Sequence, residues 1–142
     1  CKDLARQLVC DGEGVTKVAN IVCKGARDEL EATRIAETIA TSLLVKTAIF
    51  GGDPNWGRIV NAAGYSGVPF DVNKIELWIG AIRVFAEGMP TKYRESEVAE
   101  IFRQKDIQIV LNLHRGSAEA EYLTSDLSHE YVRINSDYSH RT

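Results

Sequence analysis

Residues 11–14 are the first place in the sequence where residue types and spacing suggest chemistry. They read Asp-Gly-Glu-Gly, so that Glu13 stands between two glycines. Glycine neighbours let a ligand approach the backbone closely, and the carboxylate could then bind a substrate ammonium group, a contact worth roughly 1.5–3 kcal/mol when shielded from water. The alternative is a solvated turn between two elements. A phosphate-binding loop is disfavoured, because two carboxylates repel phosphate and no GxxxxGK[ST] pattern is present.

Residues 53–58, Asp-Pro-Asn-Trp-Gly-Arg, combine a rigid turn with an amide, an indole and a guanidinium group. Arg58 could bind a carboxylate through two parallel hydrogen bonds, and a helix beginning there would add backbone N–H groups for an anion. The alternative is structural: Asp53 is the N-cap of a helix with Pro54 at its first position, Trp56 packs against the core, and Arg58 pairs with an Asp at the surface. The residues alone leave both interpretations open.

The remaining polar residues give weaker signals. His114, His129 and His140 are scattered without the H-x-x-x-H spacing of a metal site, so we expect no bound metal. Ser, Asp and His occur together at residues 125–129, but a catalytic triad needs side chains that converge with defined geometry. We therefore expect Asp126 to cap a short turn. Asn135 follows the last apolar residue and, from composition alone, is an Asn at the end of a strand.

The composition is that of one ordinary globular domain, which we place at residues 1–142. Of the 142 residues, 44% are hydrophobic and 26% are charged, enough to bury a sizeable core. The formal net charge is −3 and no run of five basic residues occurs, so we expect no nucleic-acid partner. We also expect no signal peptide and no membrane contact, because the longest nearly apolar stretch, residues 42–50, is interrupted by Lys46.

The three cysteines indicate a reducing compartment. Cys1, Cys10 and Cys23 are odd in number and form no C-x-x-C pair, which predicts neither a closed disulfide framework nor a zinc site. We therefore expect a cytoplasmic protein whose thiols pack mostly as small apolar side chains. Cys1 could be a nucleophile only if it is a true mature amino terminus.

The first half of the chain predicts helices alternating with a strand. Apolar spacing at residues 4–9 is typical of a helix already under way, which indicates a piece of a larger protein. Residues 15–23 are rich in Val, Ile and Ala and predict a mostly buried strand. An apolar stripe from Ala32 to Leu43 predicts a helix, after which residues 43–50 either extend it or form a buried strand. A further helix is expected at residues 55–63.

The second half predicts most of the sheet. Alternating apolar residues predict strands at 75–79, 82–86, 107–114 and 118–124, with a helix at 94–104 and a short last segment at 130–135. The strands at 107–114 and 118–124 flank a tight turn and are expected to pair as a hairpin. The predicted fold class is therefore α+β, or mixed α/β, with helices packed on a largely antiparallel sheet in one domain.

Four long motifs resemble the ornithine acetyltransferase family, the bifunctional glutamate N-acetyltransferases of arginine biosynthesis. They are DGEGVTK, LVKTAIFGGDPNWGRI, TSDLS and YVRINSDY, which occupy residues 11–17, 44–59, 124–128 and 131–138 in the family's order. The resemblance runs from residue 1 to residue 138 and corresponds to the C-terminal part of the family's β chain.

The resemblance implies an enzyme that cleaves itself into an α chain and a β chain. The new amino-terminal Thr of the β chain takes the acetyl group from N-acetylornithine, and glutamate then removes it in a ping-pong cycle. Neither a metal nor an organic cofactor is implied, although some members also use acetyl-CoA. The implied partners are the α chain and the rest of the β chain, in a hetero-oligomer.

The resemblance also carries individual residues across. The nucleophilic Thr and the oxyanion-hole residues lie outside this sequence, so no catalytic residue is assigned within it. Glu13 matches the family's glutamate that binds the amino-acid end of the substrate, and Asn135 matches the asparagine of its tail motif. Where the family has a third substrate contact, usually a small hydroxyl residue, this sequence has His140. Either His140 replaces that hydroxyl group, Thr142 serves instead, or the tail is altered.

Three hypotheses follow. The first is a part of an acetyltransferase that is inactive on its own and contributes substrate contacts. The second is a stand-alone binding or scaffold module derived from that enzyme. The third, an amidohydrolase that uses Cys1 as its nucleophile, would require acyl transfer that is lost on Cys1→Ser. For the motif at residues 53–58, the resemblance favours a structural role.

Overall fold

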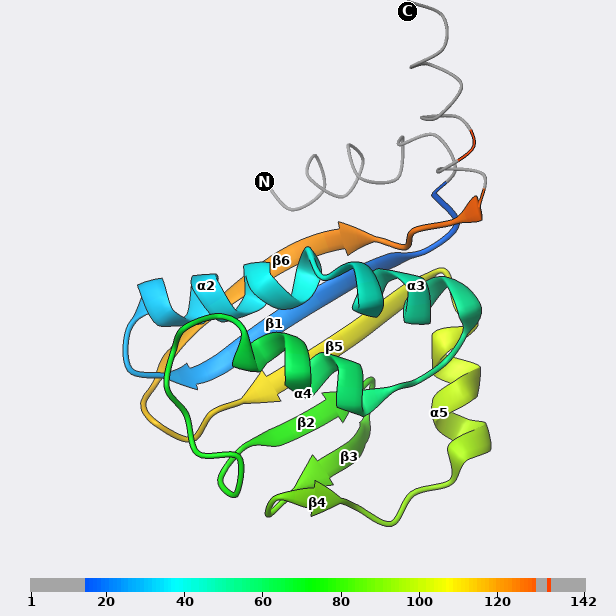
Figure 1. Cartoon of the computed structure of the whole chain (residues 1–142). Helices are drawn as coiled ribbons and strands as arrows, with labels where there is room; N and C mark the ends of the chain where they lie inside the picture. Colours follow the sequence, from blue (N-terminus) through cyan, green and yellow to red (C-terminus); the bar gives the residue numbers. More distant parts are fainter. Residues whose placement is uncertain (1–14, 130–132, 134–142) are drawn as a thin grey trace, which may run out of the picture.

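The structure is a computed structural model that describes residues 15–129 and 133. It contains a six-stranded mixed sheet in the order β4-β3-β2-β5-β1-β6 (Figure 1). The elements are β1 Val18–Ala26, α2 Glu29–Ala40, α3 Leu43–Gly51, α4 Trp56–Gly64, β2 Glu76–Ile79, β3 Ile82–Ala86, β4 Met89–Pro90, α5 Glu95–Phe102, β5 Asp106–Asn112 and β6 Ala118–Ser125. Only the β1–β5 pair is parallel among the described pairs, which confirms an α+β fold with a largely antiparallel sheet.

The predicted hairpin of the last two strands is wrong, because β1 lies between them. Val18 pairs with Asp106 of β5 in parallel register and with Ser125 of β6 in antiparallel register. Alternation along β5 shows which face of a strand is buried, but it does not identify the neighbouring strand. β1 is apolar on both faces, and burial therefore favours a place inside the sheet, where neighbours cover both of its edges.

The main core lies between the sheet and the helices α2, α3 and α4, which cover one face of it (Figure 1). The predicted stripe of α2 is buried at Ala32, Ile35, Ala36, Ile39 and Ala40. The helix begins at Glu29 because the side chain of Asp28 accepts a hydrogen bond from the N–H of Glu31, which satisfies one free donor of the first turn.

We expected residues 43–50 either to extend α2 or to form a buried strand, and both alternatives are wrong. The helix α2 ends at Ala40, and residues 43–51 form a separate helix. Ser42 starts the separate helix α3 by accepting a hydrogen bond from the N–H of Val45. Leu43, which we assigned to the stripe of the preceding helix, is 67% exposed as a result. A local side-chain cap has therefore overridden a continuous apolar pattern.

The N-cap of α4 also differs from the prediction, by two residues. Asn55, not Asp53, is the N-cap, and its side chain accepts a hydrogen bond from the N–H of Arg58. Pro54 consequently precedes the cap instead of occupying the first helical position. Both residue types are suited to a helix start, and the direction of the chain after Gly52 decides between them.

The antiparallel pairing of β1 and β6 joins the two ends of the described chain. The start of β1 and the end of β6 lie side by side, because Val18 is opposite Ser125. Within the part of the chain that the structure describes, no helix is long and apolar enough to cross a membrane.

Candidate functional site

The three predicted substrate contacts, Glu13, Asn135 and His140, lie outside the described residues, as does the alternative contact Thr142. The initial helix at 4–9 and the last segment at 130–135 fall there too, apart from Arg133. The structure does describe the point at which both segments join the fold. That point lies between the start of β1 and the end of β6.

Asp126 is the centre of this point of attachment, with only 1% of its surface exposed. Its Oδ1 accepts hydrogen bonds from the backbone N–H groups of Thr16 and Lys17, at 3.0 and 3.1 Å. Its Oδ2 accepts a short hydrogen bond from the hydroxyl group of Thr16. The N–H of Asp126 in turn donates to the carbonyl oxygen of Lys17 at 3.2 Å. The expectation that Asp126 caps a short local turn is therefore wrong, since its partners lie about 110 residues away along the chain.

Lys17 connects the same point to two helix ends. Its ammonium group donates to the carbonyl oxygens of Ile49 and Phe102, both at 2.7 Å, and reaches that of Phe50 at 3.5 Å. These carbonyl groups belong to the last turns of α3 and α5, where the helix dipole favours a cation. Burial lowers the pKa of Lys17 from its ordinary value, and the nearby charge of Asp126 opposes this effect.

Two further contacts hold the segment that follows β6. The N–H of Leu127 donates to the carbonyl oxygen of Lys46 in α3 at 3.3 Å. The rings of Phe50 and His129 meet edge to face, with centroids 5.4 Å apart. We refer to Thr16, Lys17 and Asp126, with the helix carbonyl groups of Ile49 and Phe102, as the Lys17–Asp126 junction.

The junction is a framework and not a set of reacting groups. Both carboxylate oxygens of Asp126 accept hydrogen bonds, and the ammonium group of Lys17 donates to backbone carbonyl groups. Ser125, Asp126 and His129 do not converge as a triad: Asp126 binds residues 16 and 17, whereas the ring of His129 packs on Phe50. What the junction can do is hold two segments in a defined position.

The motif at residues 53–58 has a structural role in the described contacts. Besides the N-cap already noted, the guanidinium group of Arg58 donates to the carbonyl oxygen of Leu44 at 3.1 Å, which ties the start of α4 to that of α3. Trp56 packs against Phe85, with ring centroids 5.1 Å apart. Burial and the charge of Glu95 raise the pKa of Tyr93, and the side chain of Trp56 opposes this effect.

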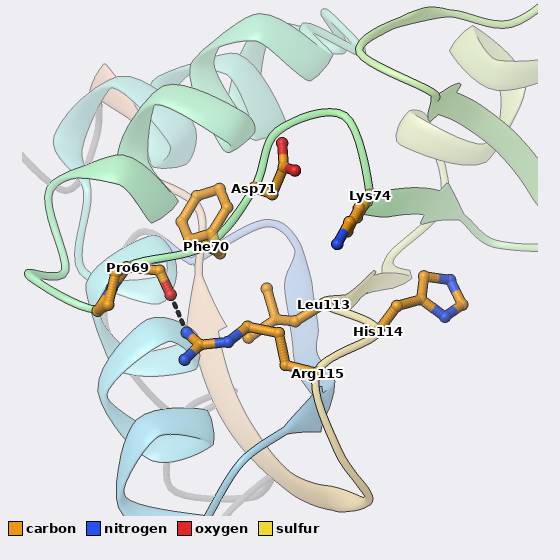
Figure 2. A pocket seen from close by; sticks show the side chains of 7 residues that line it. All are labelled: Pro69, Phe70, Asp71, Lys74, Leu113, His114 and Arg115. Carbon is orange, nitrogen blue, oxygen red and sulfur yellow. Dashed lines mark hydrogen bonds between the residues drawn. The ribbon is translucent and has the colours of Figure 1, made fainter.

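A second feature, which the sequence analysis missed, is an open pocket of about 500 Å³ beyond the carboxyl ends of β1 and β5 (Figure 2). Its lining consists of Pro69, Phe70, Asp71, Lys74, Leu113, His114 and Arg115. The seven residues of β5 separate it from the Lys17–Asp126 junction by about 20 Å. No local pattern predicts this pocket, because a loop before β2 and the turn after β5 form it together.

Among the described residues, two of the three basic side chains in this pocket have partners. The guanidinium group of Arg115 donates to the carbonyl oxygen of Pro69 (Figure 2). It also lies 3.8 Å from a carboxylate oxygen of Glu31. His114 Nε2 lies 2.5 Å from Glu76 Oε1, and Arg83 donates to Oε2 of the same carboxylate at 3.2 Å. Burial raises the pKa of Glu76, but the hydrogen bonds and positive charges of these two neighbours outweigh it, so that the pKa is lowered.

The described residues contain neither a cluster of metal-binding side chains nor a reactive thiol. Residues 15–129 and 133 contain no group of three or more His, Cys, Asp or Glu side chains that could hold a metal ion. Cys23 is fully buried in the core, where burial, helped by the charge of Glu31, raises the pKa of its thiol to about 12. For Cys23 the predicted role as a small apolar side chain is thus confirmed.

The sequence is similar to that of known proteins. The sequence pattern of the ArgJ family matches residues 1–140. The "Arginine biosynthesis bifunctional protein ArgJ" of Staphylococcus epidermidis is 45% identical over 137 residues, which cover 96% of this chain and 34% of the relative. The "Glutamate N-acetyltransferase" of Methanocaldococcus jannaschii is 42% identical over 147 residues, covering 98% of this chain and 37% of the relative.

A solved structure shows the same fold. The crystal structure of the arginine biosynthesis bifunctional protein argJ from Bacillus halodurans superimposes with a TM-score of 0.93 at 42% identity. The match covers 97% of this chain and 65% of that one. The present chain spans about one third of the length of the curated relatives named above, so it corresponds to a part of each.

Proposed function

This chain belongs to the ArgJ family, and we propose that it is part of an acetyltransferase that moves an acetyl group from N-acetylornithine to glutamate. The observation that carries the proposal is the match to a relative named glutamate N-acetyltransferase, at 42% identity over 98% of this chain. The structural likeness to the argJ protein of B. halodurans supports it, because the fold extends over nearly the whole chain.

In the proposed reaction the chemistry occurs on a threonine supplied by the rest of the protein. Its hydroxyl group attacks the acetyl carbonyl of N-acetylornithine, and the hydroxyl proton passes to the departing amine. Ornithine is released, and the acetyl group remains on the threonine as an ester. The amine of glutamate then attacks this ester, N-acetylglutamate departs, and the threonine hydroxyl group is restored. Donors outside this chain stabilise the negative charge on the carbonyl oxygen.

The proposed role of this chain is to bind substrate. Glu13 binds the amino-acid end, Asn135 adds a donor and an acceptor, and His140 or Thr142 supplies a third contact. Residues 1–142 act as one domain beside the remainder of a β chain and a separate α chain, in a cytoplasmic hetero-oligomer. Acetyl-CoA is a further acetyl donor that such an enzyme could use.

The proposal is tested with this chain in a complete protein of the relatives' length. We expect transfer of acetyl from N-acetylornithine to glutamate, and a fall of at least about tenfold in kcat/KM for Glu13→Ala, because a charge-assisted contact is lost. Glu119→Ala is the matched control, since Glu119 is exposed on β6 and should leave kcat/KM unchanged.

Intact mass measurement of the native assembly, under denaturing conditions, completes the test. A longer β chain that begins with threonine, beside a separate α chain, is the expected result. A 142-residue species alone, with no acetyl transfer, would contradict the proposal and favour the binding module.

A further inference from the structure

We infer that Asp126 is a positioning residue for the substrate site, because its buried carboxylate holds the segment that carries Glu13 against the segment that leads to Asn135. The inference rests on the proposed function, since these two substrate contacts are what Asp126 would position. The carboxylate of Asp126 binds Thr16 and Lys17, and we expect its effect on substrate to be transmitted through these two residues.

Strand pairing between β1 and β6 stops at the start of β1. The β1–β6 ladder brings Val18 opposite Ser125 at the end of β6. Glu13 lies five residues before Val18, and Asn135 lies ten residues after Ser125. Beyond this last pair, the residues before β1 and after β6 need another interaction to hold them together. The hydrogen bonds of Asp126 to Thr16 and Lys17 begin directly after the ladder ends.

The carboxylate of Asp126 matches its partners in hydrogen-bonding capacity. A carboxylate only accepts hydrogen bonds, and among the described residues it meets three donors, which belong to Thr16 and Lys17. Two of the donors are backbone N–H groups, so the side chain recognises the path of the main chain. Because a carboxylate that is 1% exposed is costly unless it is satisfied, this arrangement excludes a shifted path.

The side chain of Lys17 anchors residues 16 and 17 on the side opposite to Asp126. The ammonium group of Lys17 binds the carbonyl oxygens of Ile49 in α3 and Phe102 in α5. Residues 16 and 17 are therefore held between the end of β6 and two helix ends. Glu13 is only three residues from Thr16, and about 10 Å of extended chain is the longest reach left to it. Loss of the hydrogen bonds of Asp126 should therefore displace Glu13.

Substrate kinetics of the complete protein test the inference. We expect Asp126→Ala to raise the KM for N-acetylornithine at least tenfold, with a smaller change in kcat. Asp126→Asn and Thr16→Val should raise KM less, since each preserves the size of the side chain and removes fewer hydrogen bonds. A merely structural role would lower the melting temperature and the active fraction, which reduces the apparent kcat but leaves KM unchanged.

Thr124→Val is the matched control. Thr124 is buried on β6, two residues from Asp126, and its hydroxyl group donates to the carbonyl oxygen of Ala40 in α2 at 2.7 Å. This substitution removes a buried hydrogen bond of the same strand without touching residues 16 and 17. It should lower the melting temperature and leave KM unchanged.

Hydrogen exchange of the same proteins gives a readout that is independent of activity. The amides of Thr16 and Lys17 should exchange slowly in the wild type and in Thr124→Val, but rapidly in Asp126→Ala. An unchanged KM in Asp126→Ala, or slow exchange of these amides in that variant, would overturn the inference. A wild-type protein without acetyl transfer would instead overturn the proposed function, and exchange would still show whether Asp126 holds this segment.

Discussion

Replacing Lys17 with methionine should destabilise the folded chain through the junction at the end of the sheet. Methionine keeps an apolar stem of similar length but removes the ammonium group. The carbonyl oxygens of Ile49 and Phe102, each 2.7 Å from Nζ, would then lose a charged donor at two helix ends.

The magnitude follows from these two contacts. A hydrogen bond to a charged group contributes about 1.5–3 kcal/mol, and a cation at a helix end adds roughly 0.3–1 kcal/mol. The cost of burying the ammonium group, seen in the lowered pKa of Lys17, works against both. Because Lys17 also remains partly exposed, we expect a net loss of about 2 kcal/mol in the free energy of unfolding. In a chain of this size that loss corresponds to roughly 4–8 °C in melting temperature.

Urea unfolding of the 142-residue chain, followed by circular dichroism, measures this loss. The matched control is Lys92→Met, because Lys92 is exposed and its replacement should change the free energy of unfolding by no more than about 0.5 kcal/mol. Lys17→Gln, which keeps a neutral donor, should fall between the wild type and Lys17→Met. If Lys17→Met is as stable as Lys92→Met, the reasoning about the junction is refuted.

Three further predictions concern the core and the pocket. Cys23, with a thiol pKa of about 12, should resist iodoacetamide near pH 8 in the folded chain and react in denaturant, as peptide mass mapping would show; rapid labelling of the folded chain would contradict its burial. Glu76 has a lowered pKa, so its contribution to stability should be complete above its ordinary value of 4.5 and be lost as the pH falls through the lowered value. Glu76→Gln should therefore be less stable by about 0.5–1 kcal/mol at neutral pH, and unfolding curves should converge with the wild type in acid. Gly25→Ala should cost at least about 2 kcal/mol, because φ is +71° and a Cβ would lie 2.2 Å from Asn112 Oδ1. Gly52→Ala, at φ +68° with open space around it, should cost only about 1 kcal/mol, and equal melting temperatures for the two variants would refute the steric argument.

The candidate site shows how far local patterns reach. The residue types at positions 11–14 leave a substrate contact and a solvated turn both open, and only the resemblance assigns a substrate contact to Glu13. Asp126 has a neighbourhood that is typical of a turn, and nothing in it indicates partners at residues 16 and 17. Only the antiparallel register, with Val18 opposite Ser125, brings this carboxylate to the start of β1. A positioning residue is thus hidden from sequence reasoning when its partners are distant in the chain.

The sequence by itself determined the buried faces of its most regular elements. The apolar stripe of α2 and the alternation along β5 are local periodicities, and both produce the buried faces that they predict. The tertiary structure alone decided that β1 separates β5 from β6 and that Asp126 binds the main chain of residues 16 and 17. Periodicity specifies a face within one element, whereas neighbours and long-range hydrogen bonds depend on how all the elements are buried together.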